Sequence, residues 1–257
     1  MHEPLPILTV FRLSSSDKLP VPVLPDTFLG GSAPSLRRFS LDGISFPTFP
    51  KFVLSATYIE GLGLSDIPHS GYIPPEVMAT SLAALPNLKH LSFGFRSPLS
   101  RPLRSPPPLT RAVLPALIRL SFIGVSEYLE GFLARIHTPL LNHLAVVFFM
   151  DLIFDIPRLH DFVHRIEWSQ PFHQARIYLF GHADIEVSLG SQYQFNLEIK
   201  CERPDWQLAS MAQVLSQQLP LLSHVEQLEL HESPWFPEWK DDPDCHRHEM
   251  CSNKSTR

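Results

Sequence analysis

The chain has 257 residues, of which 44% are hydrophobic and 18% are charged. This is the composition of a protein that buries a core, and a chain of this length does so without disulfides. Its net charge of −5 argues against the basic surface that binding to nucleic-acid phosphates requires, so we expect no nucleic-acid partner.

Cysteine usage and hydropathy indicate the compartment. The three cysteines, Cys201, Cys245 and Cys251, are odd in number and unevenly spaced, so no disulfide framework is predicted. A reducing compartment, the cytoplasm or the nucleus, fits this pattern. The N-terminus has no basic region of a signal peptide, and the longest apolar run, around residues 144–150, is shorter than the roughly 20 residues of a membrane helix. We therefore expect no membrane association.

One apolar pattern recurs along the chain: an apolar residue, two variable residues, an apolar residue, one variable residue and an apolar residue. The copies are Leu8-x-x-Phe11-x-Leu13, Leu36-x-x-Phe39-x-Leu41, Ile59-x-x-Leu62-x-Leu64, Leu88-x-x-Leu91-x-Phe93, Leu117-x-x-Leu120-x-Phe122, Leu141-x-x-Leu144-x-Val146 and Val225-x-x-Leu228-x-Leu230. The last apolar positions of the first six copies are 28, 23, 29, 29 and 24 residues apart. The alternating pair points one face of a short strand into a core. Steps of this size with this signature predict an α/β fold, an irregular leucine-rich-repeat solenoid with parallel strands and short helices.

The segments that return the chain to the next strand are predicted to be helical. Residues 75–85 have apolar side chains three and four apart behind two prolines. Residues 128–136 have a similar pattern, with Ser126 as a candidate N-cap. Residues 206–219 form the longest candidate helix, bounded by prolines. Strands that alternate with helices indicate a parallel sheet.

The pattern is irregular between Val146 and the last copy. Residues 175–179 and 194–199 alternate as strands but are too close together to enclose a helix, so we expect a hairpin-like excursion or irregular repeats here. Residues 97–110 are rich in Pro, Ser and Arg, which predicts a loop within a solenoid of residues 1–239. Residues 240–257 are polar and predict a disordered tail.

Several stretches together resemble a family of F-box/leucine-rich-repeat proteins of mushroom-forming fungi (basidiomycetes). They are residues 36–44, 54–57, 67–76, 88–95, 124–130 and 139–142, and the resemblance extends over residues 5–240. It implies an F-box that docks on the Skp adaptor of an SCF ubiquitin ligase, followed by repeats that bind a substrate. The resemblance therefore implies a protein-recognition module, similar to the substrate-binding repeat region of an F-box ubiquitin-ligase receptor.

The chain departs from the family plan at both ends. No segment ahead of Leu8 is long enough for an F-box, and the family's further repeats do not follow Trp239. We therefore expect the chain to bind the Skp adaptor only if an F-box is supplied. The alternative is a stand-alone interaction scaffold, or a truncated product with no ligase role.

Motifs for chemistry are weak. No P-loop, dinucleotide-binding glycine motif, nucleophile elbow or H-E-x-x-H pattern occurs, so we expect no enzyme and no cofactor. His160 and His164 are spaced for two metal ligands on one helix face beside Asp161, but no third ligand is identifiable at matched spacing, so we interpret this as a solvated helix face and expect no metal site. The soft ligands of residues 245–251 lie in the polar tail, where free thiols are the simpler interpretation. The proline-rich segment is interpreted as a linker rather than a kinase or SH3 target.

The open face of the sheet is the candidate binding surface. Residues between the core positions of each strand point away from the core. These are Arg12; Arg38, Ser40 and Asp42; Gly61, Gly63 and Ser65; His90, Ser92 and Gly94; Arg119, Ser121 and Ile123; and His143, Ala145 and Val147. Their middle column is small, and the column before it has Arg38, His90, Arg119 and His143, which we name the ridge. It predicts a shallow groove for an acidic or phosphorylated protein segment, and the alternative is an ordinary solvated sheet face.

Overall fold

The computed structural model describes residues 5, 7–15, 21–31, 33–96, 110–149, 156–168, 172–180, 184–190, 194–200, 212 and 225–233. Three predicted segments lie outside the described residues: most of the loop at 97–110, the helix at 206–219 apart from Ala212, and the tail at 240–257 with its cysteines and histidines.

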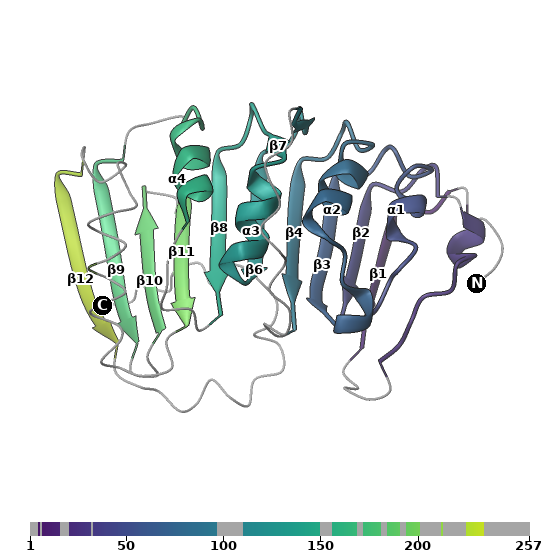
Figure 1. Ribbon diagram of the computed structural model, residues 1–257, viewed down its shortest axis with the longest axis horizontal. Helices are drawn as coiled ribbons and strands as arrows, with labels where there is room; N and C mark the ends of the chain where they lie inside the picture. The colour runs from purple at the N-terminus through teal and green to yellow at the C-terminus, as the bar shows by residue number, and fades with distance from the viewer. Residues whose placement is uncertain are drawn as a thin grey trace, which may run out of the picture.

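A mixed α/β fold is built on one large sheet. Ten strands lie in the order β1-β2-β3-β4-β6-β8-β11-β10-β9-β12, and all neighbours are parallel except those of β10 (Figure 1). The strands are β1 (Val10–Ser14), β2 (Arg38–Asp42), β3 (Gly61–Ile67), β4 (His90–Phe95), β6 (Arg119–Gly124), β8 (His143–Phe148), β9 (Gln174–Phe180), β10 (Asp184–Leu189), β11 (Phe195–Lys200) and β12 (Gln227–Ser233).

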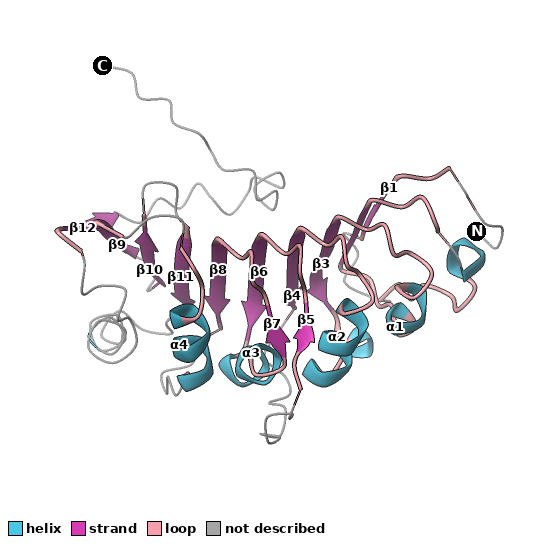
Figure 2. Cartoon of the chain, turned by 90° about the horizontal axis from the view of Figure 1, so that it is seen from above, coloured by secondary structure: helices cyan, strands magenta, loops and turns pink. Residues whose placement is uncertain are grey.

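Short helices cover one face of this sheet, and no described helix lies on the opposite face, which we call the open face (Figure 2). They are α1 (Phe49–Phe52), α2 (Pro75–Leu82), α3 (Ser126–Leu133) and α4 (Pro157–His164), with single 3-10 turns at η1 (Phe28–Gly31) and η2 (His69–Gly71). The sheet is bent, with the helices on its outer side (Figure 2). No helix in the described part of the chain is long and apolar enough to cross a membrane.

Each of the seven apolar repeats predicted a strand, and the structure has a strand at each one. The register follows from the shared pattern, because the same apolar position pairs from strand to strand: Phe39 with Leu62, Leu62 with Leu91, and Leu91 with Leu120. A ladder of backbone hydrogen bonds at the start of the strands holds this alignment, as when the Lys89 amide donates to the Glu60 carbonyl at 2.8 Å. The predicted parallel arrangement of these strands is therefore confirmed.

The irregular region is an antiparallel excursion, the first of the two arrangements that the sequence left open, and it has one more strand than predicted. The chain passes from β8 to β9, returns through β10 and ends the excursion at β11, which pairs parallel to β8. Val187 and Leu189 of β10 are buried, and so is Ser188 between them. β12 then pairs parallel to β9 and lies at the margin of the sheet.

Aromatic residues fill the core between the sheet and the helices. One cluster joins Phe28, Phe39 and Phe52, and the ring centroids of Phe39 and Phe52 are 5.0 Å apart. A second cluster centres on Tyr128, which is 1% exposed and stacks on Phe122 at 5.9 Å. The Tyr128 hydroxyl donates to the Ile73 carbonyl at 2.8 Å and so ties α3 to the segment that leads into α2.

The predicted helix ends need correction around α3. Ser126 is the first helical residue rather than the N-cap, which is Val125. The helix ends at Leu133, and Ile136 instead belongs to β7 (Ile136–His137), which pairs with β5 (Ala112–Val113). The α2 helix likewise ends at Leu82 rather than at residue 85. Residues 136 and 137 pair with β5 and therefore do not continue the helix. Because β5 is distant in sequence, a local pattern could not predict this pairing.

Candidate functional site

The ridge residues lie in one row across neighbouring strands. Arg38 pairs with Gly61, Gly61 with His90, His90 with Arg119, and Arg119 with His143. Strands β2, β3, β4, β6 and β8 lie side by side in this order (Figure 1). Adjacent strands are about 4.8 Å apart, so His90, Arg119 and His143 are near neighbours. Gly61 separates Arg38 from His90 by one strand.

Along each strand, exposed residues of the open face alternate with buried core residues. Within β4, Leu91 and Phe93 are buried while His90 and Ser92 are exposed, and β6 repeats this alternation. Arg38, His90 and Arg119 are exposed and His143 is half-buried. Arg38 and Arg119 make no ion pair with any residue that the structure describes.

The two histidines of the ridge have lowered pKa values. Partial burial lowers the pKa of His90, and Arg119 is the next largest cause of this lowered pKa. Burial also lowers the pKa of His143, with Arg119 and then His90 as further causes. Both imidazoles are therefore held toward their neutral form, first by burial and then by nearby cations, and an anion would relieve the second cause.

An acidic residue that the sequence analysis missed lies at the start of β3. Glu60 accepts hydrogen bonds from Arg37 at 2.6 Å and from Lys89 at 3.0 Å. These two partners lower the pKa of the Glu60 carboxyl, Lys89 first. Its charge is thus engaged by Arg37 and Lys89, beside the ridge and not within it. The three residues each precede a strand in the same register, a signal that the sequence carried.

Two further rows of residues lie beside the ridge, and their side chains are smaller than those of the ridge. One residue of these rows, Gly94, is not exposed as predicted. Ser40, Gly63, Ser92, Ser121 and Ala145 pair in succession, and Arg12 ends this row beside Ser40. Gly94 was predicted to be an open-face position but is buried. A Cβ built on Gly94 would lie 2.8 Å from the Cβ of Ile123, so Ile123 covers it. The row that contains Gly94, Ile123 and Val147 is thus more apolar than the ridge.

A second charged group, also missed, marks the far end of β3. Asp66 has a φ of 50°, a backbone conformation that aspartate tolerates better than most residues, and it lies at a register shift between β3 and β4. Arg96 donates through Nε to its Oδ2 at 2.9 Å. The Ser65 hydroxyl donates to Asp42 Oδ1 at 2.9 Å. This group is acidic overall and lies at the opposite ends of the strands from the ridge.

The open face continues onto the antiparallel excursion and β12. Arg176 donates through Nε to Glu229 at 2.9 Å, and Gln174 donates to the other oxygen of Glu229 at 3.0 Å. The rings of Tyr178 and His231 stack at 4.9 Å. Arg176 lowers the pKa of the Glu229 carboxyl, and His231 is the next cause. These charges satisfy each other, so this part of the face differs from the ridge.

His160 and His164, whose spacing would suit two metal ligands, meet no further ligand among the described residues. The rings of His160 and His164 meet edge to face at 4.6 Å, and His160 Nδ1 is 3.7 Å from Asp161 Oδ1. The described residues contain no group of three or more histidine, cysteine, aspartate or glutamate side chains that could hold a metal ion.

Comparison with known proteins identifies no relative: no family model, no curated protein and no solved structure matches the chain. The geometry of the open face is therefore the starting point for function.

Proposed function

We propose that the chain is a leucine-rich-repeat solenoid that recognises another protein and catalyses no reaction. Two features support this proposal. The strands recur at the repeat spacing, and short helices pack behind them on one side only. The opposite side is a broad, open sheet face, which is the form of surface that repeat proteins offer to protein partners.

The proposed ligand is an acidic or phosphorylated protein segment bound along the ridge. The observation that carries this proposal is the alignment of Arg38, His90, Arg119 and His143 in one row on the open face. Guanidinium groups bind carboxylates and phosphates through paired hydrogen bonds. The adjacent row of small residues leaves room for an extended backbone beside these side chains.

Binding of an anion is coupled to proton uptake. The pKa values of His90 and His143 are lowered in the free chain, so the histidines gain charge below the ordinary value of about 6.5. An anion on the ridge favours the charged imidazolium and raises both pKa values. Affinity should therefore increase as the pH falls, and the His90→Asn/His143→Asn variant should lose most of this pH dependence.

The direct test is charge reversal of the two ridge arginines. The probe is a fluorescent peptide rich in Asp and Glu, together with its phosphoserine counterpart. Arg38→Glu/Arg119→Glu should weaken binding about 30-fold, equivalent to about 2 kcal/mol, if both contacts are desolvated, and much less if they are at the rim. The matched control is Lys51→Glu/Arg158→Glu, which changes the net charge equally on the helix-bearing side.

Two results would contradict the ridge as a binding surface. One is equal affinity of the ridge variant and the wild-type chain for both peptides. The other is equal weakening by the control variant, which would indicate a response to net charge alone. Thermal unfolding of Arg38→Glu/Arg119→Glu checks the assigned strand register. The arginine side chains point away from the core, so the variant should remain folded, and its unfolding would mean that the register is wrong.

The resemblance to F-box proteins supports a role in substrate capture for an SCF ubiquitin ligase in the cytoplasm or nucleus. The alternative is a stand-alone interaction scaffold or a truncated product. A pull-down with the purified Skp adaptor distinguishes them. The ligase proposal expects binding only when an F-box is fused to the chain, together with ubiquitylation of a protein held on the ridge. A tight complex with the unfused chain would overturn the expectation that the F-box must be supplied.

A further inference from the structure

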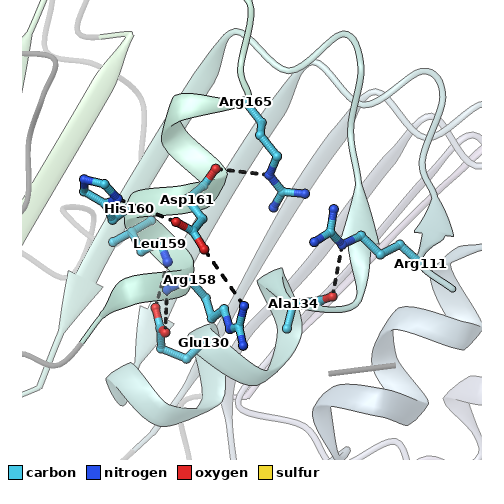
Figure 3. Close-up of polar contacts among 8 residues, drawn as sticks. All are labelled: Arg111, Glu130, Ala134, Arg158, Leu159, His160, Asp161 and Arg165. Atoms are coloured by element: carbon cyan, nitrogen blue, oxygen red, sulfur yellow. Dashed lines mark hydrogen bonds and ion pairs between the residues drawn. The ribbon is translucent and has the colours of Figure 1, made fainter. Parts of the chain in front are cut away.

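Two arginines face each other on the helix-bearing side of the molecule. Arg165 follows the last turn of α4, and Arg111 immediately precedes β5. Their guanidinium groups point toward one another across the ends of α3 and α4 (Figure 3). This surface is on the other side of the sheet from the ridge, so nothing in the proposed function uses it (Figure 2).

Among the described residues, each guanidinium donates a hydrogen bond through one nitrogen. Arg165 donates through Nε to the Asp161 carbonyl at 3.0 Å, and Arg111 donates through Nε to the Ala134 carbonyl at 3.3 Å (Figure 3). The Arg165 guanidinium also lies over the Phe162 ring, with Cζ 5.7 Å from the ring centroid. The anchoring leaves both terminal nitrogens of each group without a hydrogen bond to any described residue. It therefore fixes the direction of the donors before a ligand arrives, which lowers the entropic cost of binding.

The neighbouring carboxylates, Glu130 and Asp161, both contact groups other than the two guanidiniums. Both oxygens of Glu130 accept hydrogen bonds from the first turn of α4, from the Arg158 and Leu159 amides at 2.8 Å each (Figure 3). The Asp161 carboxylate is 3.9 Å from Arg158 and 3.7 Å from His160. Within the described residues, Arg111 and Arg165 form no ion pair. Partial burial lowers the pKa of Arg165, and Arg111 is the next cause, a sign that the two cations are close enough to repel each other; the Asp161 carboxylate acts in the opposite direction.

A purely structural role explains only part of this arrangement. Arginine side chains commonly satisfy carbonyls at helix C-termini and interact favourably with the helix dipole there. One nitrogen of each guanidinium has that role here. Two cations directed at each other still carry a repulsive cost, which a structural cap does not require and which an anion between them would remove.

We propose that Arg111 and Arg165 form a binding site for a phosphate monoester, the group carried by phosphoserine and phosphothreonine. Two planar guanidinium forks provide four terminal nitrogens, which match the three terminal oxygens and near-double negative charge of such a group better than a single carboxylate. The phosphate has two possible sources, a partner protein or this chain. Ser105-Pro106 lies six residues before Arg111 in the sequence (111 − 105).

The test follows the arginine side chains directly by NMR. The full chain, labelled with nitrogen-15 arginine, is titrated with N-acetyl-phosphoserine methylamide, and its unphosphorylated analogue serves as the ligand control. The Nε–H signals of Arg111 and Arg165 should shift with the phosphorylated probe alone. Arg111→Gln/Arg165→Gln should weaken binding at least tenfold. Arg111→Lys/Arg165→Lys keeps the positive charge at the helix ends and should also weaken binding, because lysine lacks the fork.

Two control variants separate this site from other cationic surfaces. Arg158→Gln removes a neighbouring arginine that is already near a carboxylate, and it should leave the signals of the pair responsive. Arg38→Gln/Arg119→Gln disables the ridge and should also leave them responsive, so this site and the proposed function can fail independently. Thermal unfolding of the lysine variant should match that of wild type within a few degrees, since the cap charges remain.

The two sources of phosphate give different spectra. If the phosphate belongs to this chain, phosphorylation of Ser105 shifts the signals of the pair before any probe is added and blocks the probe. If it belongs to a partner, Ser105 phosphorylation leaves the signals unchanged and the probe still shifts them. Signals that respond to neither would overturn the proposal, as would equal binding by wild type and the glutamine variant.

Discussion

Removal of the Tyr128 hydroxyl tests whether its hydrogen bond to the segment before α2 stabilises the packing of α3 on that segment. Tyr128 is 1% exposed, and its hydroxyl donates to the carbonyl of Ile73, itself buried, at 2.8 Å. The Tyr128→Phe variant keeps the ring that packs on Phe122 and Phe95 but leaves the Ile73 carbonyl without its donor. An unsatisfied buried acceptor costs about 1–3 kcal/mol, and the variant loses little else.

We therefore expect Tyr128→Phe to lower the free energy of unfolding by about 1.5 kcal/mol. In a domain of this size each kcal/mol corresponds to about 2–4 °C, so the melting temperature should fall by about 3–6 °C. Urea unfolding followed by circular dichroism measures the first quantity and calorimetry the second. The matched control is Tyr58→Phe, because Tyr58 is 58% exposed and its substitution should be neutral. A Tyr128→Phe variant as stable as wild type would refute the hydrogen bond as a source of stability.

Three further predictions concern other parts of the fold. Glu130→Ala should lower the free energy of unfolding by about 2 kcal/mol because α4 loses its N-terminal acceptor, while Glu130→Gln, which keeps one oxygen, should be intermediate in urea unfolding. The lowered pKa values of His90 and His143 mean that the unfolded chain binds more protons, so stability present above about pH 6.5 should decline as the pH falls toward the folded pKa values. The urea midpoint of His90→Asn/His143→Asn should decline less than that of wild type between about pH 7.5 and pH 5.5, and equal declines would refute the link. Leu228 and Leu230 are 52% and 56% exposed on a marginal strand, so the chain should self-associate at high concentration, and Leu228→Lys/Leu230→Lys should shift it to a monomer in sizing with light scattering.

The strand register could be predicted from the sequence because it depends on a local pattern. Each repeat places its two core residues two positions apart, so aligning Phe39 with Leu62 and Leu91 also aligns the residues just before them. That is why the row from Arg38 to His143 was accessible without a structure. The burial of Gly94 was not, because it depends on the size of Ile123 on the next strand.

The features that the sequence analysis missed depend on contacts between distant segments. Glu130 is 28 residues from Arg158, and its role at α4 requires α3 and α4 to pack side by side. The pairing of Ile136 with Ala112 likewise needs a partner beyond the reach of a local pattern, and it ends the predicted helix early. Strand β10 had a readable alternation but no repeat signature, since an antiparallel excursion does not follow the spacing of the parallel strands.

The distribution of ion pairs is compatible with the proposed binding of anions by a chain whose net charge is −5. Glu60, Asp66 and Glu229 each neutralise a nearby arginine, so these acidic groups are satisfied locally. The two arginines of the ridge, Arg38 and Arg119, and the Arg111–Arg165 pair instead form no ion pair with a described residue, and all four are exposed to solvent. Salt screens such charges over about 10 Å at 0.1 M ionic strength but has little effect on a buried apolar core. Peptide binding at the ridge and phosphate binding at the pair should therefore both weaken between about 0.05 M and 0.5 M sodium chloride, while the urea midpoint changes little. Binding that withstands this change of salt would mean that apolar contacts, not these arginines, hold the ligands.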